Sequence, residues 1–386
     1  MDNVFVGFLL FGLLNNVLYV IILSAAIDLV GEATPKAVVL LPDIIPAFTI
    51  KLVAPLFIHL IPYNVRLMAT VALSFVGMLC ISVVPSLFGR IFGIVLASFS
   101  SGVGEITFLQ LSHYYHRKPS LGGFASGTGC AGLFGSFYYM VLTNLFKFQS
   151  WKVLLLSSFL PFGFLVTFYW ILPPFQNHYV PLDTSESPVL AKSSWKHSFT
   201  TTIAKIKPLV IPYMVPLCLV YICEYTINQG ISPTLLYPLD KVPRWLFLSY
   251  RDMYVVYGFQ YQLGVFISRS SINFGVRIHN LYMLSALQFV NVVILLFQSL
   301  YDIPFTSIYV LMVVMFYEGL LGGFSYINTF MSVSEEVEEQ NREFCMGSVT
   351  ISDSLGIVIA GLISWLLEPG LCRYQVDHGR NWCLGG

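Results

Sequence analysis

Long apolar stretches without a single Asp, Glu, Lys or Arg constrain this chain more than any other feature of its sequence. A transmembrane helix needs about 20 consecutive apolar residues to cross the hydrocarbon core of a bilayer. Of the 386 residues, 56% are hydrophobic and only 10% are charged, whereas soluble domains carry about 25% charged residues. The sequence therefore predicts a protein that crosses the bilayer many times. The uncharged stretches are Val4–Ile27, Leu67–Gly89, Pro119–Phe146, Val153–Leu182 and Asn280–Tyr301.

The charge balance and the cysteines argue against several other classes of protein. Lys and Arg together number 20, as do Asp and Glu, and without a basic block nucleic acid binding has no electrostatic support. The first apolar stretch is far longer than the core of a signal peptide, so we expect it to be a retained helix. No CxxC or His-rich spacing predicts a metal site, and we expect no cofactor. In the polar tail, Cys372 and Cys383 are the two cysteines that could pair.

The order of apolar and polar segments predicts an all-α protein with about eleven transmembrane helices in two halves. A polar linker, 174–205, separates six predicted helices in residues 1–173 from five in residues 206–368, and a polar tail follows in 369–386. We expect the proline-rich stretch 231–248 to lie at the membrane interface. Two such halves joined by a linker are the layout of the major facilitator fold. The predicted helices cover residues 4–30, 36–61, 66–87, 90–115, 121–146, 151–173, 206–230, 249–268, 278–301, 304–328 and 344–368.

The distribution of Lys and Arg favours a cytosolic N-terminus by a small margin. With that orientation, ten Lys and Arg residues fall on the cytosolic side and nine in the opposite loops and tail, with Lys51 left out because it lies in a predicted helix. Cytosolic loops of membrane proteins carry the excess of Lys and Arg. The linker and the loop 269–277 account for this preference.

Lys51 is a cation within a predicted transmembrane helix, where it costs roughly 2.5–3.5 kcal/mol on insertion scales. It follows Asp43 by eight residues, or about two helical turns, with Pro46 between them. One interpretation is a structural ion pair within the helix or with a neighbouring helix. The other is a cation that faces an anionic substrate. The sequence leaves both open for Lys51, and we assign Asp43 a structural role.

Polar residues form stripes on the first, fourth, seventh and tenth predicted helices. Glu105 shares one helix face with Ser98 and Ser101, because residues four and seven apart lie on the same side of a helix. In the major facilitator arrangement these four helices line the central cavity. Ser and Asn in such stripes commonly form packing hydrogen bonds, whereas we favour the cavity for Glu105 and Glu224. The candidates for substrate binding are Asn16, Lys51, Glu105, Tyr221, Glu224, Asn228, Gln229 and Glu318.

Two further charged residues lie near predicted helix ends. Arg269 follows the eighth helix in the sequence Ser268-Arg269-Ser270-Ser271. It could close a cytosolic gate through a salt bridge or bind a phosphate bidentately, and we favour the gate. Asp353 lies about one turn into the eleventh helix, where we favour a structural pairing with a basic residue.

Short motifs rich in glycine and polar residues occur in order along the chain. They are Leu23-Ser24-Ala25-Ala26, Asp43-Ile44 with Ile50–Pro55, Ser100–Glu105, Ser126–Gly129, Glu224–Gly230, Ser268–Ser271, Tyr317–Gly323, Arg342–Phe344 and Ile351–Gly356. These motifs resemble those of the battenin family, the family of the Batten disease protein. The resemblance extends from about residue 5 to residue 367, so it is specific.

The resemblance implies a multispanning protein of the lysosomal and late endosomal membrane, related to major facilitator transporters. The family is required to clear glycerophosphodiesters, the deacylated products of phospholipids, from lysosomes, and it has been linked to lysosomal pH and basic amino acids. A family sorting feature, a Met followed ten residues later by Gly, matches Met346 and Gly356. The family's prenylation box would fall on Cys383–Gly386, which lacks the usual aliphatic residue, so we expect no prenylation.

We expect alternating access around a cavity between the two halves, with a glycerophosphodiester as the small-molecule substrate. Lys51 or Arg269 would neutralise its phosphate, and one of the three intramembrane glutamates would take up a proton because burial disfavours a charged carboxyl. One alternative is a basic amino acid transporter, for which these glutamates form an anionic pocket. Another is a trafficking scaffold that binds protein partners through the loops 174–205 or 333–343. No spacing of a nucleophile and base supports an enzyme.

Overall fold

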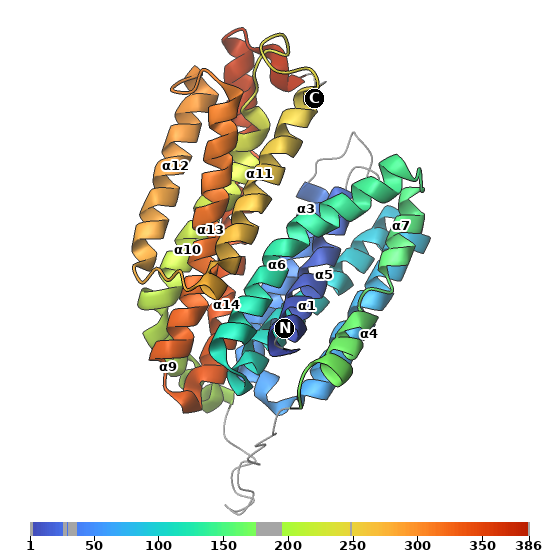
Figure 1. Ribbon diagram of the computed structural model, residues 1–386, viewed down its shortest axis with the longest axis vertical. Coiled ribbons are helices and arrows are strands. Elements are labelled where there is room, and N and C mark those ends of the chain that lie inside the picture. Colours follow the sequence, from blue (N-terminus) through green and yellow to red (C-terminus); the bar gives the residue numbers. More distant parts are fainter. Residues whose placement is uncertain (1–2, 26–28, 30–36, 175–194, 248, 385–386) are drawn as a thin grey trace, which may run out of the picture.

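The computed structural model describes residues 3–25, 29, 37–174, 195–247 and 249–384, and the elements in this part of the chain are helices. In the described residues, eight helices or continuous helical runs are long and apolar enough to cross a membrane. Three more helices, α3, α6 and α11, run alongside them (Figure 1). The predicted all-helical, multispanning architecture is therefore confirmed. The helices are α1 (Asn3–Ser24), α3 (Ala37–Val53), α4 (Tyr63–Val83), α5 (Leu87–Leu111), α6 (Arg117–Met140), α7 (Ser150–Ser157), α8 (Phe162–Val166), α9 (Trp195–Leu209), α10 (Val215–Thr226), α11 (Tyr250–Ser270), α12 (Leu281–Tyr301), α13 (Ile308–Glu336) and α14 (Glu339–Asp377).

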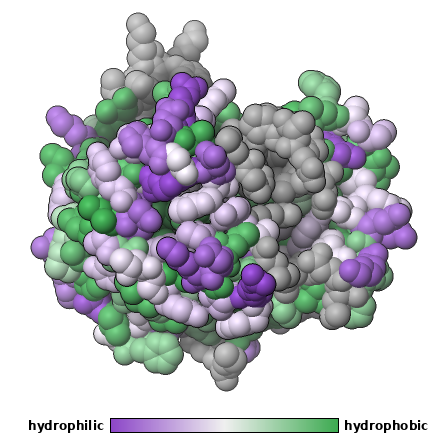
Figure 2. Space-filling model, turned by 90° about the horizontal axis from the view of Figure 1, so that it is seen from above, coloured by the Kyte–Doolittle hydropathy of each residue, from purple (hydrophilic) through white to green (hydrophobic). Residues whose placement is uncertain are grey.

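Large apolar side chains on the outside of the bundle indicate where lipid lies. Phe88, Trp170 and Leu366 expose 81%, 83% and 79% of their surface. Soluble monomers rarely expose apolar surface on this scale, because contact between apolar surface and water is unfavourable. Seen from above, the molecule also presents several groups of hydrophilic side chains (Figure 2). The outer wall of the bundle thus suits a lipid environment and its end face suits water.

The chain forms two halves that stand side by side, α1 to α8 and α9 to α14 (Figure 1). Most of the predicted linker, residues 175–194, lies outside the described residues, and α9 begins at Trp195 within the rest of it. The stretch 235–247 is irregular and buries Leu235, Tyr237 and Phe247 in the C-terminal half. At the other boundary, α14 continues to Asp377, well into the predicted polar tail.

An aromatic cluster and a close helix contact hold the N-terminal half together. The rings of Phe11 and Phe108 stack with their centroids 4.2 Å apart, and Phe124 and Phe164 pack beside them. Behind this cluster α1 and α6 lie backbone to backbone. A side chain at Gly127 would overlap the carbonyl oxygen of Leu9, so only glycine permits this approach.

The two halves contact each other mainly toward one end of the bundle, which we call the linker end because residues 174 and 195 lie there. The contacts join α6 to α11 and α3 and α5 to α14. Gly129 of α6 is one close approach, since a Cβ there would lie 2.9 Å from the Cα of Phe266 on α11. Toward the opposite end the ribbons of the two halves spread apart (Figure 1).

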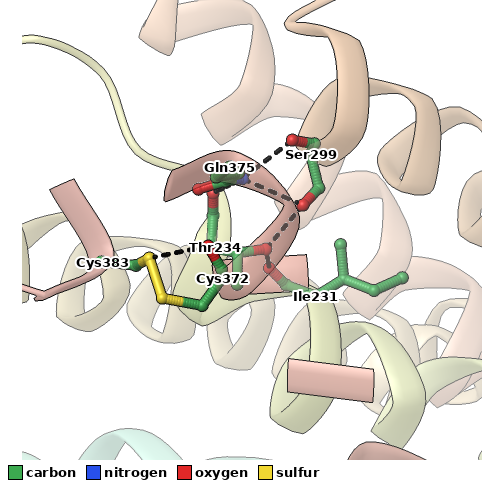
Figure 3. The surroundings of a disulfide bond; sticks show 6 residues. All are labelled: Ile231, Thr234, Ser299, Cys372, Gln375 and Cys383. Carbon is green, nitrogen blue, oxygen red and sulfur yellow. Dashed lines mark hydrogen bonds between the residues drawn. A yellow bond between two sulfur atoms is a disulfide. The ribbon is translucent and has the colours of Figure 1, made fainter. Parts of the chain in front are cut away.

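The opposite end, which we call the disulfide end, is capped by the C-terminal segment. Cys372 and Cys383 form a disulfide with their Cα atoms 5.8 Å apart, so the pair that the sequence left open is joined. Gln375 is 1% exposed, and its Nε2 donates to the carbonyl oxygens of Thr234 at 2.9 Å and Ser299 at 2.8 Å (Figure 3). One carboxamide therefore ties α14 to the ends of α12 and of the helical run that contains α10.

Candidate functional site

Lys51 lies in a buried ion cluster, which we define as Lys51, Glu105 and Asp353. Its Nζ is 2.6 Å from Glu105 Oε2 and 3.3 Å from Asp353 Oδ1, and it donates to Ser354 Oγ at 2.8 Å. The side chains of Lys51 and Asp353 are 4% and 6% exposed, and that of Glu105 is 12% exposed. Since α3 and α5 belong to one half and α14 to the other, the ion cluster joins the halves. Asp43 takes no part in these ion pairs.

Arg269 of α11 reaches the same boundary from the C-terminal half. Its Nη1 donates to Thr128 Oγ1 of α6 at 2.6 Å and its Nη2 to the hydroxyl of Tyr221 at 3.0 Å. The guanidinium lies over the ring of Tyr326, 4.2 Å from its centroid, an arrangement that attracts a cation to the ring face. The Nε of Arg269 is buried without a hydrogen-bond partner. Within the described residues, Arg269 forms no salt bridge with a carboxylate.

Tyr326 connects Arg269 to the ion cluster. Its hydroxyl donates to Glu105 Oε1 at 3.0 Å while its ring stacks under the guanidinium. The contacts therefore run from Arg269 through Tyr326, Glu105 and Lys51 to Asp353, passing from the C-terminal half to the N-terminal half and back. Two cations and two carboxylates share this path, and Tyr326 lies between Arg269 and the carboxylate of Glu105.

Glu224 and Glu318 form a second acidic group, inside the C-terminal half. Glu224 is 2% exposed and accepts a hydrogen bond from the hydroxyl of Tyr261, and Glu318 is fully buried and accepts one from Asn228 Nδ2 at 2.9 Å. The Oε2 atom of each glutamate is buried without a partner. Neither carboxylate forms a salt bridge in the described part of the chain. Two buried charges without a cation are unfavourable, so this pair is suited to bind a proton or a cation.

A third set of contacts closes the boundary nearer the linker end. Glu343 of α14 accepts hydrogen bonds from the hydroxyls of Tyr63 at 2.6 Å and Tyr114 at 2.8 Å, both from the N-terminal half. Asn273, after α11, donates to Ser126 of α6 at 3.0 Å. These are hydrogen bonds that any opening of the linker end has to break.

The other predicted site residues lie around these groups. Asn16 is partly exposed, and its amide bonds to Gly12 on its own helix. Asn228 and Gln229 lie in a π-helical turn, Ile227–Ile231, and are also partly exposed. Such turns often mark functional positions in helices. Asp43 is 5% exposed with an unpartnered Oδ2, and it faces the small cavity that Asn15 lines.

Met346 and Gly356, the proposed sorting pair, lie inside the helix bundle. Met346 is 1% exposed. A Cβ on Gly356 would lie 2.7 Å from the Cβ of Tyr221 and 2.8 Å from the carbonyl oxygen of Cys218, so this glycine sets the approach of α14 to α10. Their surroundings are those of packing residues.

The sequence did not single out several residues that complete the site. Thr128 lies within a motif that the sequence showed, but its contact with Arg269 depends on the packing of α6 against α11. Tyr261 lies in the middle of α11, away from the charged residues near the two ends of that helix, so nothing in the pattern marked it. Tyr63, Tyr114 and Glu343 come from separate loops and helix ends. Among the described residues no group of three or more His, Cys, Asp and Glu side chains could hold a metal ion.

The chain is similar to known proteins over nearly its whole length. A model of the family described as CLN3 protein matches residues 6–188 and 175–374. Protein BTN1 of Debaryomyces hansenii is 59% identical, covering 99% of this chain and 97% of that protein. Protein BTN1 of Candida albicans is 56% identical, covering 100% of this chain and 98% of that protein.

Three solved structures of transporters have a similar arrangement of helices. The human organic anion transporter MFSD10 gives a TM-score of 0.65 at 13% identity, covering 99% of this chain and 95% of that chain. A bacterial homologue of the iron transporter ferroportin, in an outward-facing state, gives 0.61 at 14% identity over 99% and 96%. The proton:xylose symporter XylE, a major facilitator protein, gives 0.58 at 13% identity over 99% and 91%. At these identities the likeness concerns the fold, and the predicted major facilitator fold is confirmed.

Proposed function

This chain belongs to the CLN3 (battenin) protein family and has the major facilitator fold, and on that premise we propose that it exports glycerophosphodiesters from the lysosome by alternating access. The family and the fold support a membrane transporter rather than an enzyme. The substrate class comes from the resemblance to the battenin family, and the chemistry of the boundary between the halves is compatible with it. A glycerophosphodiester carries one phosphate charge and several hydroxyl groups, so it requires one available cation and nearby polar side chains.

The position of Arg269 and the groups that it contacts are the observation that supports the proposal. Its guanidinium lies at the boundary between the halves without a carboxylate partner among the described residues, and its Nε is unpartnered. A guanidinium binds phosphate oxygens with two parallel hydrogen bonds. Lys51, by contrast, already contacts two carboxylates. We therefore place the phosphate at Arg269 and assign Lys51 to the ion cluster.

The hydroxyl groups of the substrate would meet polar side chains of the first and seventh transmembrane helices. Tyr221 already accepts a hydrogen bond from Arg269, so a phosphate bound there lies within reach of its hydroxyl. Asn16, Asn228 and Gln229 are partly exposed and offer amide groups. Neutral donors and acceptors suit a polyol, because they add no charge that the substrate would have to balance.

Alternating access requires the linker end to open. In this structure that end is closed by the bond from Lys51 to Asp353, by the two tyrosine bonds to Glu343 and by the contacts of Arg269 with α6. A phosphate at Arg269 would compete with Thr128 for the guanidinium. Substrate binding would thereby weaken one of the contacts that hold the halves together, which links occupancy to opening.

Glu224 and Glu318 would couple transport to protons. Each has a buried oxygen without a partner, and no cation balances the pair in the described residues. One proton shared between them would reduce the cost of burying both. Glu105 is a weaker candidate because Lys51 holds it in an ion pair. An acidic lumen would supply the proton.

The disulfide supports a luminal position for the C-terminal end. Disulfides persist in oxidising compartments and are rare in the cytosol, and the bond between Cys372 and Cys383 lies at the disulfide end. Eleven crossings then place the N-terminus and the linker end in the cytosol. The lysosomal and late endosomal location is part of the same proposal. In this orientation the structure would be closed toward the cytosol.

Uptake by proteoliposomes tests the proposed function. Protein reconstituted with an acidic interior or exterior should transport labelled glycerophosphoglycerol, and Arg269→Gln should reduce the rate at least about 10-fold because it removes a charge-assisted phosphate contact. Arg244→Gln, at an exposed position of the disulfide end, is the matched control and should transport normally. Equal transport by Arg269→Gln and Arg244→Gln would contradict the assignment of the phosphate site.

One observation favours a second candidate, the export of basic amino acids. Glu224 and Glu318 together present two carboxylates without a cation among the described residues, and a lysine or arginine substrate would supply one. Competition separates the two candidates. If unlabelled arginine displaces labelled substrate and glycerophosphoglycerol does not, the anion proposal fails and the basic amino acid proposal replaces it.

A further inference from the structure

A second cavity, separate from the ion cluster and from Arg269, opens at the linker end. Its volume is about 450 Å³, within the range of roughly 300–1,000 Å³ that is usual for small-molecule sites. We call it the basic pocket. It is lined by Ser112, His113, Tyr115, His116, Arg117, Lys118, Pro119, Ser334, Glu339, Arg342 and Met346.

The lining of the basic pocket carries an excess of positive charge. Arg117, Lys118 and Arg342 contribute three cations against the single carboxylate of Glu339. Cations gathered around one cavity repel each other unless an anion lies between them. The three salt bridges in the described part of the chain involve none of these side chains.

Two nitrogen atoms in this lining are buried without a hydrogen-bond partner, His113 Nδ1 and Arg342 Nε. Buried polar groups are nearly always paired, so each such atom calls for an explanation. Helix α6 begins at the same cavity with Arg117, and its first turn adds backbone N–H groups that suit an anion. Cationic side chains, two unpartnered side-chain nitrogen atoms and a helix N-terminus therefore converge on one space.

The basic pocket also spans the boundary between the two halves. His113 lies between α5 and α6, and Arg117 and Lys118 begin α6, whereas Glu339 and Arg342 lie in the first turns of α14. Next to it, Glu343 accepts the hydrogen bonds of Tyr63 and Tyr114. A ligand in the basic pocket would contact both halves at the end where they are closed.

We propose that the basic pocket binds a small polyphosphorylated anion that bridges the two halves, either as a soluble molecule such as an inositol polyphosphate or as the headgroup of a phosphoinositide. One phosphate group would leave most of this cavity unfilled. None of its lining residues belongs to the ion cluster or contacts Arg269, so the inference does not depend on the identity of the transported substrate.

Thermal unfolding of the full chain in detergent tests the proposal. Inositol hexakisphosphate is the soluble probe and inorganic phosphate its singly phosphorylated comparison, at equal ionic strength. A ligand that binds the folded state raises the unfolding midpoint in a saturable way. We expect inositol hexakisphosphate to raise the midpoint by a few degrees and inorganic phosphate to leave it unchanged. For the lipid source, nanodiscs of phosphatidylcholine with and without phosphatidylinositol bisphosphate should give the same contrast.

Variants show whether the basic pocket is responsible. Lys118 is exposed, so Lys118→Gln should fold normally and lower the affinity for inositol hexakisphosphate roughly two- to fivefold. Arg117→Gln combined with Lys118→Gln should abolish the shift. The matched control, Lys241→Gln with Arg244→Gln, removes two exposed cations at the disulfide end and should keep the full shift.

Several outcomes would overturn the inference. They are no shift with either polyphosphorylated probe, an equal shift with inorganic phosphate, and a shift that survives in the pocket variants. If glycerophosphoglycerol displaces inositol hexakisphosphate, the pocket is part of the transport path instead. Failure of substrate transport alone would leave this result unaffected, because unfolding is measured without a substrate.

Discussion

Lys51 and Asp353 are separated by 302 positions in the chain, yet the ammonium of one lies 3.3 Å from the carboxylate of the other across the boundary between the two halves. Both side chains are nearly inaccessible to water. A buried pair of this kind contributes little net stability, because the cost of removing two charges from water offsets their attraction. Removing one partner is destabilising, because the other charge then stays buried without compensation.

Lys51→Met should therefore destabilise the protein strongly. The change leaves Glu105 and Asp353 buried without their cation, which costs about 3–5 kcal/mol for a broken buried pair. Thermal unfolding in detergent measures the effect. Adding Asp353→Asn to Lys51→Met should restore part of the loss, since it removes one uncompensated charge. Lys241→Met, at an exposed position, is the control. A loss no greater than that of the control would contradict the pairing.

Tyr63→Phe should make the linker end open more often. It removes the hydroxyl that donates to Glu343 at 2.6 Å, and a hydrogen bond to a charged group contributes about 1.5–3 kcal/mol. Cys345, 3% exposed on α14, is a natural reporter. Its labelling by a maleimide, read by mass spectrometry at that site, should be faster in the variant. Tyr309→Phe, on the exposed surface of α13, should leave the rate unchanged. An unchanged rate in Tyr63→Phe would show that this bond does not hold the end closed.

Gly356→Ala and Gly361→Ala should differ although they lie on the same helix. A methyl group at Gly356 meets Tyr221 and the backbone of Cys218 within 2.8 Å, whereas nothing lies within 4 Å of one at Gly361. Overpacking costs about 1–3 kcal/mol, and alanine in an open helical position gains up to about 1 kcal/mol over glycine. The unfolding midpoints of the two variants should thus shift in opposite directions. A comparable loss in both would mean that helix packing is not the role of Gly356.

Cys372→Ser should loosen the cap at the disulfide end. The bond closes a loop with a sequence separation of 11. In the chain-entropy model, a disulfide that closes a loop of about this size stabilises the folded state by about 3 kcal/mol. Hydrogen exchange should become faster around Gln375 while exchange in α1 and α6 stays the same. Cys80→Ser, a change at a free cysteine of the other half, serves as the control. Protection of Gln375 that survives the loss of the disulfide would show that its hydrogen bonds suffice.

The sequence allowed the fold to be predicted because membrane insertion leaves few choices. An uncharged stretch such as Asn280–Tyr301 favours a helix in lipid, since the backbone there has no water to bond to. The helix ends were harder to predict. The continuation of α14 to Asp377 runs through charged residues and Pro369, where neither hydropathy nor proline rules mark a helix. It depends on the contacts that Gln375 makes with other helices.

The candidate site was predictable in its members and not in its pairings. The cost of intramembrane charge marks Lys51, Glu105 and Asp353 from sequence alone. Their grouping depends on how three helices pack, and the partner nearest in sequence, Asp43, is not the one that Lys51 contacts. The position of Arg269 over the ring of Tyr326 was equally unpredictable. Nothing in the sequence marks Tyr326 as the partner of a cation. The residues of the site can be predicted from the cost of a charge within the membrane, whereas their arrangement follows from tertiary contacts.

The length of α14 has a mechanical consequence. Asp353, which contacts the N-terminal half, and Gln375, which holds α12 and the end of the α10 run, lie on this one helix. At a rise of 1.5 Å per residue they are about 33 Å apart. A helix clamped at one end acts as a lever, so a small displacement at the ion cluster has to turn the clamped helices with it. The C-terminal half would then rock as a rigid body around the clamp, and the strength of the Gln375 contacts would set how stiff that motion is.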